Sequence, residues 1–491
     1  MYSDTIEKGA SMKVLFAAAE VAPFSKVGGL ADVVGSLPKY LEKDVEIAIF
    51  TPLYGCVDKE KYNIKLVENS KLKINFGWSE NIFSLYVAKL PGSKINVFFI
   101  ENPKYFTCFD MVYPFNIDER YNHERFIAFS RAVLEYTQLL NFKPDVIHAN
   151  DWHTGMLPVY LKTTYKDNEF FNNTKTVFSI HNLSHQGMFY DDVLDFAQIP
   201  KSEVMTSDGL ELFGHVNWMR GGINYSNKVV AVSPTYAKEI QTPQGGHNID
   251  CTLRENSYKL IGILNGIDTK EFNPKTDKTI AKNFDKKDPS GKAECKKALA
   301  KEFGLEYNEN RPIIGMVSRL SDQKGFELFW GIDDELTSLE ADIVILGTGD
   351  MWLEAHFDKL SRTSKNVRTH MKFSHKLANL IYAGSDMFLM PSKFEPCGLS
   401  QIISMRYGTL PIVRVTGGLE DTVVGYPLKK ANGFKFWDYD STNMLNGIKY
   451  AISVFKDKNE WKKLVKSAMG YDYSWKKSAE KYLELYSTLS E

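Results

Sequence analysis

Three loops combine charged residues with glycines in patterns that suit ligand binding. The first runs from Glu20 to Asp32 and places Lys26 just before Gly28 and Gly29. Paired glycines let the backbone approach a ligand closely, and free N–H groups at a helix start attract an anion. The loop contains neither GxGxxG nor a Walker pattern, so both common nucleotide fingerprints are missing from it. The alternative is an ordinary strand-to-helix turn with a surface lysine.

The second loop, residues 318–325, carries Arg319 and Lys324. Because this loop must turn back before the helical pattern that follows it, both cations can converge on one pair of phosphates. Arginine would fork across two oxygens, and lysine would act as a point charge. The alternative is that Arg319 pairs with a carboxylate at the edge of the core.

The third loop begins at Ser392 and contains Glu395, which a proline follows directly. A carboxylate at the end of a buried strand, facing a helix start, can accept hydrogen bonds from hydroxyls. The alternative is that Glu395 only compensates the positive end of the next helix. A second glycine pair, Gly417 and Gly418, follows the apolar run 410–415 and repeats the turn that suits phosphate.

Two further candidates, Asp151 and His181, each come after a short apolar run. His181 and His185 have the four-residue spacing of a zinc pair. They follow a strand pattern rather than lying on a helix, so a zinc site is not favoured. A single histidine at a strand end also often has a purely structural role.

The two halves of the chain position these loops with the same pattern. Each half opens with a short apolar run, then a turn-rich loop and a helical pattern. Apolar runs that alternate with helical patterns indicate βαβ units and parallel sheets covered on both faces. We therefore predict an α/β protein with two doubly wound domains facing each other, whose ligands lie at the carboxyl ends of the strands. The apolar runs are 13–19, 145–149 and 175–180 in the first half and 312–318, 342–347 and 386–391 in the second.

The domain boundaries follow from changes in composition. The stretch from Phe272 to Arg311 is rich in Lys, Asp and Asn and has no strand pattern, although Cys295, Leu299 and Phe303 have helical spacing. The end of the chain has the spacing of an amphipathic helix. The predicted parts are an N-terminal extension at 1–11, a first domain at 12–272, a connector at 273–310, a second domain at 311–470, and a C-terminal helix at 471–491 that packs back on the first domain.

Composition excludes several classes of protein. The 491 residues are 43% hydrophobic and 25% charged, which are ordinary globular values. A formal net charge of −1 gives no reason to expect nucleic acid or an anionic membrane as a partner. The five cysteines are widely separated, which favours reduced thiols over a disulfide framework. No apolar run reaches the roughly 18 residues of a membrane span, and residues 1–11 lack the apolar stretch of a signal peptide.

Taken in order, the motifs of the chain resemble those of the glycogen and starch synthases, family 5 glycosyltransferases of the ADP-glucose type. The resemblance extends from Met12 to the final helix, and the motifs are long enough to be specific. They are KVGGLAD (26–32), IHNLSHQG (180–187), NYSNKVVAVSPTYAKEI (224–240), LNGIDTKEFNP (264–274), VSRLSDQKG (317–325), PSKFEPCGLSQ (391–401) and MRYGTLPIVRVTGGLEDTV (405–423).

This resemblance implies a GT-B-type fold, in which two Rossmann-like domains face each other across a cleft. It also implies transfer of glucose, with retention, from ADP-glucose to the non-reducing end of an α-1,4-glucan. ADP is released, and neither a metal nor another cofactor is required. The implied partners are ADP-glucose and the glucan, and the implied location is the bacterial cytoplasm or the plastid stroma; the oligomeric state is left open.

The resemblance assigns individual roles as well. The implied catalytic residues are Asp151, His181, Arg319, Lys324 and Glu395. The implied donor-binding residues are Lys26, Gly28, Gly29, Phe373, Cys397, Gly398, Leu399, Thr416, Gly417 and Gly418, with Phe373 against adenine. The implied acceptor-side residues are Glu20, Asp32 and Asn265. The scheme that we favour on this basis is a front-face substitution in which the leaving phosphate receives the acceptor proton.

The chain departs from the family pattern at three places. Ile403 stands where many GT-B relatives have a second glutamate, Asn379 stands where this family usually has histidine, and the loop 425–434 is short. Two alternatives stay open: the same reaction with UDP-glucose, and a glucan-binding or priming homologue with weak activity. A nucleotide-dependent oxidoreductase is disfavoured, because neither domain start contains GxGxxG.

Overall fold

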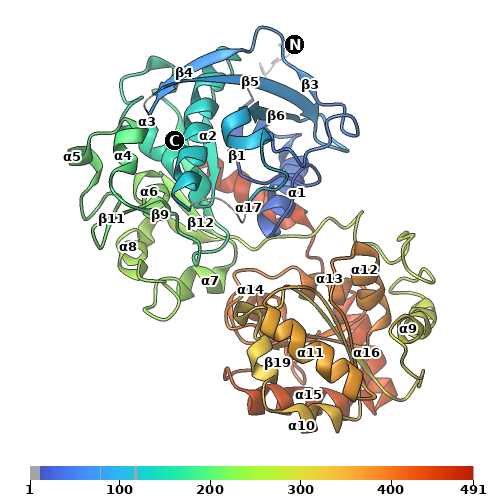
Figure 1. Ribbon diagram of the computed structural model, residues 1–491. Coiled ribbons are helices and arrows are strands. Elements are labelled where there is room, and N and C mark those ends of the chain that lie inside the picture. The colour runs from blue at the N-terminus through green and yellow to red at the C-terminus, as the bar shows by residue number, and fades with distance from the viewer. Residues whose placement is uncertain (1–10, 78, 115–118, 490–491) are drawn as a thin grey trace, which may run out of the picture. The chain divides into compact units, whose positions relative to one another are not determined.

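The computed structural model describes residues 11–77, 79–114 and 119–489. The predicted extension at 1–11 lies outside them except for its last residue. The chain divides into two compact units (Figure 1). The first holds the residues up to Val232, then Ala237–Ile263, and the chain from Trp475 onward; the second holds Ser233–Tyr236 and Leu264–Ser474.

The first unit is built on a mainly parallel sheet. Its strands are β1 (Lys13–Ala17), β2 (Glu46–Pro52), β3 (Lys65–Leu66), β4 (Leu72–Phe76), β5 (Ser79–Lys89), β6 (Asn96–Glu101), β7 (Val146–Asn150), β8 (Lys175–Ile180), β12 (Lys228–Ala231) and β13 (Leu260–Gly262). They lie in the order β13-β12-β8-β7-β1-β2-β6-β5-β3, with β4 beside β5. Strands β3, β4 and β6 pair with β5 in the antiparallel sense.

Helices and a small second sheet complete this unit. The small sheet has the order β10-β11-β9. Its strands are β9 (Met188–Phe189), β10 (Glu211–Leu212) and β11 (His215–Asn217). The helices are α1 (Gly29–Leu41), α2 (Glu119–Leu139), α3 (Met156–Lys162), α4 (Val193–Ala197), α5 (Lys201–Val204), α6 (Trp218–Tyr225), α7 (Pro234–Glu239, whose first residues belong to the second unit), α8 (Asp250–Glu255) and α17 (Trp475–Ser487).

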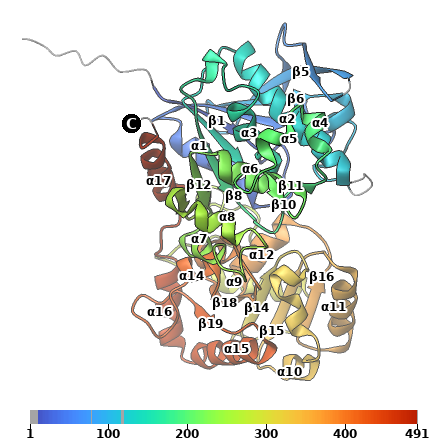
Figure 2. The ribbon, with the colours of Figure 1, turned by 90° about the vertical axis from the view of Figure 1, so that its left-hand side faces the viewer.

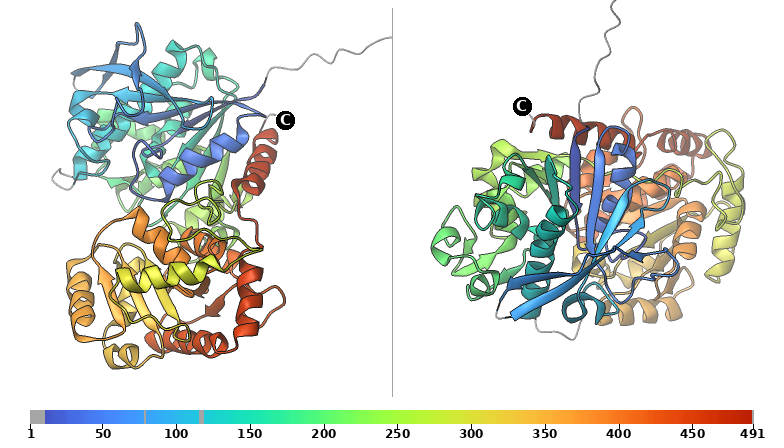
Figure 3. Two further views of the ribbon diagram at one scale, coloured as in Figure 1. Left: turned by 90° about the vertical axis from the view of Figure 1, so that its right-hand side faces the viewer. Right: turned by 90° about the horizontal axis from the view of Figure 1, so that it is seen from above.

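The C-terminal helix α17 packs beside α1 (Figure 3). It buries Trp475, Ala479, Tyr482, Leu485 and Tyr486, which lie at three- and four-residue spacings. This is the apolar stripe of an amphipathic helix, and it covers the first unit although the helix follows the second unit in the chain.

The second unit contains a parallel sheet of order β16-β15-β14-β17-β18-β19. Its strands are β14 (Ile313–Val317), β15 (Asp342–Leu346), β16 (Val367–His370), β17 (Met387–Met390), β18 (Leu410–Arg414) and β19 (Phe434–Phe436). Its helices are α9 (Gly291–Glu302), α10 (Asp333–Thr337), α11 (Met351–Thr363), α12 (His375–Gly384), α13 (Ser400–Arg406), α14 (Gly417–Thr422), α15 (Ser441–Phe455) and α16 (Lys458–Ala468). Helix α12 packs on β14 and β15, with α9 against it, and α15 packs on β18 and β19 (Figure 2).

Residues 273–310, which the sequence predicts to be a connector, belong to the second unit. Helix α9 buries Cys295, Leu299 and Ala300, and these side chains are part of the same core as β14. The helical spacing of Cys295, Leu299 and Phe303 therefore marks a core-facing stripe. The polar composition of this stretch reflects its solvent face, because a helix at the edge of a domain needs only one apolar stripe.

The two sheets confirm the predicted α/β class. In the first, β1 has β2 on one side and β7 on the other; in the second, β14 has β15 and β17 beside it. The strand order reverses at β1 and at β14, and ligands of such sheets bind at the carboxyl ends of these strands.

Within the described residues, no helix combines the length and the apolar character that crossing a membrane requires.

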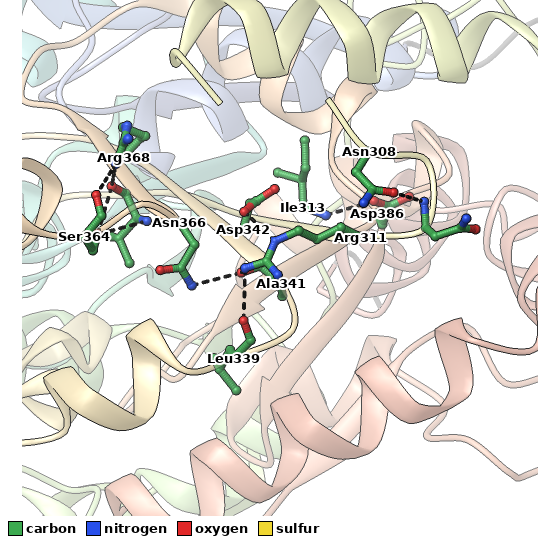
Figure 4. Close-up of polar contacts among 12 residues, drawn as sticks. Asn308, Arg311, Ile313, Leu339, Ala341, Asp342, Ser364, Asn366, Arg368 and Asp386 are labelled. Atoms are coloured by element: carbon green, nitrogen blue, oxygen red, sulfur yellow. Dashed lines mark hydrogen bonds and ion pairs between the residues drawn. The ribbon is translucent and has the colours of Figure 1, made fainter. Parts of the chain in front are cut away.

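The amino ends of the second sheet form a closed polar network (Figure 4). Arg311 donates to Asp342 Oδ1 at 2.7 Å and to the carbonyl of Ala341 at 2.8 Å. Asp386 accepts from the amide of Ile313 at 2.9 Å, and it forms an ion pair with Lys296. Charges at this edge are thus compensated within the protein, so a ligand site is expected at the opposite edge.

Candidate functional site

The centre of the candidate site is an ion pair between the loops after β14 and β17. Nζ of Lys324 lies 2.8 Å from Oε1 and 2.7 Å from Oε2 of Glu395. Ser392 Oγ donates to Glu395 Oε2 at 3.0 Å. Glu395 is only 4% exposed, so its carboxylate is held in one position. An ammonium group has three N–H donors, and two contacts to Glu395 leave one for a ligand.

Arg319 belongs to the same loop as Lys324 and is exposed. In the described part of the chain it makes no hydrogen bond or ion pair, so the predicted alternative, a partner carboxylate at the core edge, is not found there. The loop turns sharply at Gly325, whose φ is 75°. A Cβ at Gly325 would lie 2.0 Å from the carbonyl oxygen of Pro391, so glycine is required for this loop to pack against the β17 loop.

A pocket of about 50 Å³ lies between these loops. Lys324 and Glu395 line it together with Ser392, Gly398 and Leu399. The structure therefore brings residues of two separate sequence motifs together at the carboxyl ends of β14 and β17, the edge at which the sequence predicts ligands.

The glycine pair at 417–418 packs directly behind Glu395. Gly417 has a φ of 44°, and a Cβ there would lie 1.9 Å from the carbonyl oxygen of Glu395. A Cβ at Gly418 would lie 2.0 Å from the carbonyl oxygen of Cys397. The Gly418 amide donates to the Glu395 carbonyl at 3.1 Å, and Thr416, which is buried, occupies the N-cap position of α14. These glycines thus have a packing role in addition to the donor contact predicted for them.

Cys397 and Asn265 lie side by side in the second unit. Burial raises the pKa of the Cys397 thiol to about 12, and the Asn265 backbone donates to it. Asn265 is itself buried, and its Oδ1 has no hydrogen-bond partner in the described residues. Although the sequence assigns Asn265 to the acceptor side, the structure places it next to the Glu395 loop.

Phe373 follows β16 and is 78% exposed. Its ring meets the His375 ring edge-on, with 4.7 Å between the centroids. The residue is at a carboxyl end of the sheet, but it does not line the pocket at Glu395, from whose strand β16 is separated by β15 and β14. An exposed ring at this edge can stack on a planar ligand group.

The loop after β1 arranges its charges differently from the sequence-based expectation. Glu20 is buried, and its Oε2 accepts from the amides of Val27 at 2.6 Å and Gly28 at 2.9 Å. The amide of Gly28, at the helix start that we expected to bind an anion, is therefore occupied by a carboxylate of the protein, as is the amide of Val27. Tyr113 donates to Glu20 Oε1 at 2.7 Å, so both carboxylate oxygens of Glu20 accept hydrogen bonds from other residues of the protein.

Lys26 in this loop forms an ion pair with Asp32 at 2.6 Å. A Cβ built at Gly28 or Gly29 meets no atom within 4 Å, and neither glycine has a positive φ. No contact in the described residues requires glycine here, and the space above these two residues is open. This leaves room for a ligand beside the ammonium group of Lys26.

Asp151 and His181 lie together after β7 and β8. Asp151 has a φ of 57° and a ψ of 175°, a region that only glycine adopts without strain, and such strain concentrates at functional sites. Its Oδ1 accepts from the His181 amide at 2.7 Å. Burial raises the pKa of Asp151 to about 7, so this carboxyl group titrates near neutral pH.

His181 is held as a neutral ring. Burial lowers its pKa to about 3, and its Nε2 lies 2.9 Å from Oδ1 of Asn150. The amide group of Asn150 donates to two backbone carbonyls, so its Oδ1 is the acceptor and His181 Nε2 carries the proton. Nδ1 of His181 is then an acceptor, suited to a ligand hydroxyl.

Sequence reasoning missed three residues that position this chemistry. Tyr113 holds Glu20, Asn150 sets the tautomer of His181, and Ser392 holds Glu395. Asn150 and Ser392 are each within three residues of a predicted site residue, in strand-end motifs already singled out. Tyr113 has no such signal, because it lies 93 positions from Glu20 in the sequence.

Two of the three departures from the family pattern, Asn379 and the short loop 425–434, form local contacts. Asn379 donates to Asp277 Oδ2 and to Thr279 Oγ1, both at 3.1 Å, and so ties α12 to the segment before α9. The short loop 425–434 is closed by Asn432, which accepts from the Val424 amide at 2.7 Å.

In the described residues, no three His, Cys, Asp or Glu side chains are grouped so that they could hold a metal ion.

Comparisons with known proteins agree with this arrangement. Residues 13–255 match the family model of the starch synthase catalytic domain, and residues 299–468 match that of the glycosyl transferases group 1. The chain is 44% identical to a glycogen synthase of Thermosipho melanesiensis, with 97% of this chain and 98% of the relative covered. It is also 44% identical to a glycogen synthase of Clostridium botulinum, with 98% and 100% covered.

A solved structure is similar over the whole chain. It is the catalytic domain of starch synthase IV from Arabidopsis thaliana, bound to ADP and acarbose. The TM-score is 0.91 and the identity 34%, with 98% of this chain and 100% of that chain covered. Together with the two sheets and their strand-end loops, these matches establish a GT-B glycosyltransferase. The chain therefore belongs to the glycogen and starch synthase family.

Proposed function

We propose that the protein transfers glucose from ADP-glucose to the non-reducing end of an α-1,4-glucan, with retention and release of ADP. The observation that carries this proposal is the ion pair of Lys324 with Glu395, in the loops after β14 and β17, together with Arg319, which has no polar partner among the described residues. This arrangement offers a cation for a diphosphate and a fixed carboxylate for sugar hydroxyls. The similar starch synthase IV domain binds ADP and acarbose, which supports a nucleotide donor and an oligosaccharide acceptor for this chain.

Charge compensation is the main contribution of the second unit. The diphosphate gains negative charge as the bond to the sugar breaks, so preorganised cations favour the transition state over the ground state. Arg319 can fork across two phosphate oxygens, and the remaining N–H of Lys324 can bind a third. In this proposal Arg and Lys provide the compensation, and neither a metal nor another cofactor is required.

Side chains that accept hydrogen bonds contact the donor glucose and the glucan. Glu395 binds hydroxyls of the donor glucose, and Nδ1 of neutral His181 and the Asp151 carboxylate accept from hydroxyls of the glucose or the glucan. In the front-face scheme, the C1–O bond to the phosphate breaks while the acceptor oxygen bonds to C1 from the same side. The acceptor proton passes to the leaving phosphate oxygen, so no enzyme nucleophile is needed.

The experiment that tests this proposal measures initial rates with ADP-glucose and UDP-glucose, each with glycogen as acceptor. We expect ADP release and chain extension with ADP-glucose, and digestion of the added glucose by an α-1,4-specific amylase. Faster turnover with UDP-glucose would replace the donor assignment. Absence of nucleotide release with both donors, under conditions where the protein still binds glycogen, would leave the glucan-binding alternative. The bacterial relatives favour a bacterial cytoplasm as the place of this reaction.

A further inference from the structure

A pair of exposed tryptophans, Trp330 and Trp352, is not among the residues that line the pocket at Glu395. Trp330 is 62% exposed and Trp352 is 45% exposed, and their ring centroids lie 5.7 Å apart with an angle of 66° between the planes. Met351, next to Trp352, is 85% exposed. Large apolar side chains gathered at one exposed place are uncommon on a protein surface and mark a contact site.

Local structure explains why the two indoles meet. Trp330 directly follows a short 3₁₀ turn, Phe326–Phe329, and Trp352 lies in the first turn of α11 (Figure 1). His356, one turn further along α11, lies under Trp330, with 5.1 Å between the ring centroids. All these residues belong to the second unit, so their arrangement is a property of one compact body.

The segments that carry Trp330 and Trp352 are connected to the hydrophobic core. Phe357, the residue after His356, is fully buried and packs against Phe329 at 5.4 Å and Phe326 at 5.6 Å. Each tryptophan is thus joined through the chain to a buried aromatic cluster. The segments that carry the two tryptophans are therefore anchored in the core, and the Trp330 ring also contacts the rings of Trp352 and His356.

The charges around the pair are acidic. The first turn of α10 contains Asp333, Asp334 and Glu335, and Asp350 and Glu354 lie at the start of α11. Asp333 also contacts these rings, because its Oδ1 lies 3.3 Å from Nε2 of His356, which packs against Trp330. Such a rim repels phosphates and nucleic acid. It accepts hydrogen bonds from hydroxyl groups, which carry no charge.

From this combination we infer that Trp330 and Trp352 form a second binding site for α-glucan, distinct from the reaction site. The apolar C–H faces of successive glucose units stack on the two indoles, and the rim carboxylates accept from the glucose hydroxyls. The choice of α-glucan as ligand rests on the proposed function. A site of this kind holds a polymer on the enzyme between transfers and raises the concentration of chain ends near the reaction site.

The test compares the full-length double variant Trp330→Ala/Trp352→Ala with the unaltered protein. Affinity for glycogen is measured by electrophoresis in gels that contain glycogen, without any donor. We expect about tenfold weaker affinity, in line with the loss of two aromatic contacts. The KM for glycogen should rise to a similar degree, whereas kcat and KM with a short maltooligosaccharide should stay unchanged.

Two further variants serve as controls. Trp437→Ala removes another highly exposed tryptophan, which is 65% exposed and follows β19, and should leave glycogen affinity unchanged. Trp330→Phe/Trp352→Phe keeps two rings and should recover most of the affinity. Equal loss in the Trp437 control would show that the effect is not specific to the pair and would overturn the inference.

Three other results would also overturn it. The first is unchanged glycogen affinity in the folded alanine variant. The second is a raised KM for ADP-glucose with unchanged glycogen affinity, which would assign the pair to the donor. The third is binding of a cationic peptide, lost at high salt, in place of glycogen. Because the gel assay needs no donor, failure of glucose transfer would contradict the proposed function alone and leave this inference to its own test.

Discussion

The ammonium group of Lys324 contacts both carboxylate oxygens of Glu395, although the two residues are 71 positions apart. The pair is asymmetric, because Glu395 is nearly buried while Lys324 is partly exposed. Removing the lysine therefore leaves a buried carboxylate without its cation, whereas neutralising the glutamate leaves a lysine that water can still reach. The proposed function adds a second asymmetry, since Lys324 faces the phosphates and Glu395 the sugar.

Lys324→Ala is expected to lower kcat by about a hundredfold or more, because a cation at the leaving group is lost. The protein should stay folded, but its free energy of unfolding should fall by about 1–3 kcal/mol, since Glu395 keeps an uncompensated charge. Lys324→Met/Glu395→Gln should recover most of that stability without recovering activity. Urea unfolding and initial rates measure the two effects. Turnover like that of the unaltered protein in the single variant would contradict the assigned role.

Arg319→Ala should reduce kcat/KM for ADP-glucose by about a hundredfold while changing the free energy of unfolding by less than about 0.5 kcal/mol. The reason is that Arg319 is exposed and makes no polar contact in the described residues. Arg319→Lys keeps the charge but not the fork, so it should restore only part of the rate. A large loss of stability in the alanine variant would show that Arg319 has a structural partner instead.

The pH profile of the rate should follow Asp151. Burial raises its pKa to about 7, and the ionised form accepts from a substrate hydroxyl, so kcat is expected to rise with pH through about 7. This step should disappear in Asp151→Asn and persist in His181→Gln, because His181 has a pKa of about 3 and stays neutral over this range. A step that survives in Asp151→Asn would assign the ionisation to another group.

Asp151→Asn, which should remove the pH step in the rate, should also make the protein more stable at high pH. The pKa of Asp151 is raised in the folded state, so the folded protein binds more protons than the unfolded chain between pH 3.8 and about 7. Its contribution to stability is complete below the unfolded pKa and is lost as pH rises through about 7. Asp151→Asn should therefore raise the free energy of unfolding at pH 8 by on the order of 2–4 kcal/mol. Thermal unfolding at pH 5 and pH 8 checks this, and equal effects at both pH values would contradict it.

Phe373→Ala should raise the KM for ADP-glucose several-fold and leave kcat and stability nearly unchanged. The ring is highly exposed, so its removal opens no cavity, whereas a stacked base contributes about 1–3 kcal/mol to binding. Phe373→Tyr should restore the KM. Measuring KM separately for donor and glycogen distinguishes this role from a general loss of activity, and an unchanged donor KM would remove Phe373 from the adenine site.

Tyr486→Phe tests how α17 is held on the first unit. The Tyr486 hydroxyl lies 2.6 Å from Nδ1 of His148, whose Nε2 lies 2.7 Å from Ser179 Oγ. Both rings are buried, so the variant leaves a ring nitrogen without a partner and should cost about 1–3 kcal/mol in the free energy of unfolding. Catalysis should be unaffected at low temperature. Unchanged urea unfolding would show that packing alone holds the helix.

The fold class and the family of this protein can be predicted from its amino-acid sequence alone. Alternating apolar runs and helical patterns predict two doubly wound units, because periodicity is set by local geometry. The motifs around Lys26, Arg319 and Glu395 are predicted at strand carboxyl ends, where the structure places them. The stripe of α17 was also visible, since a helix repeats its apolar residues at three- and four-residue spacings.

The interaction partners of these residues become apparent only in the folded chain. The contact between Lys324 and Glu395 depends on β14 lying beside β17, and strand order is not encoded in periodicity. Glu20 accepts hydrogen bonds from the amides of Val27 and Gly28, in the loop that the sequence predicts to bind an anionic ligand. The polar stretch at 273–310 joins the second core because one stripe of α9 is apolar. In each case the deciding interaction joins residues whose proximity arises only when the chain is folded.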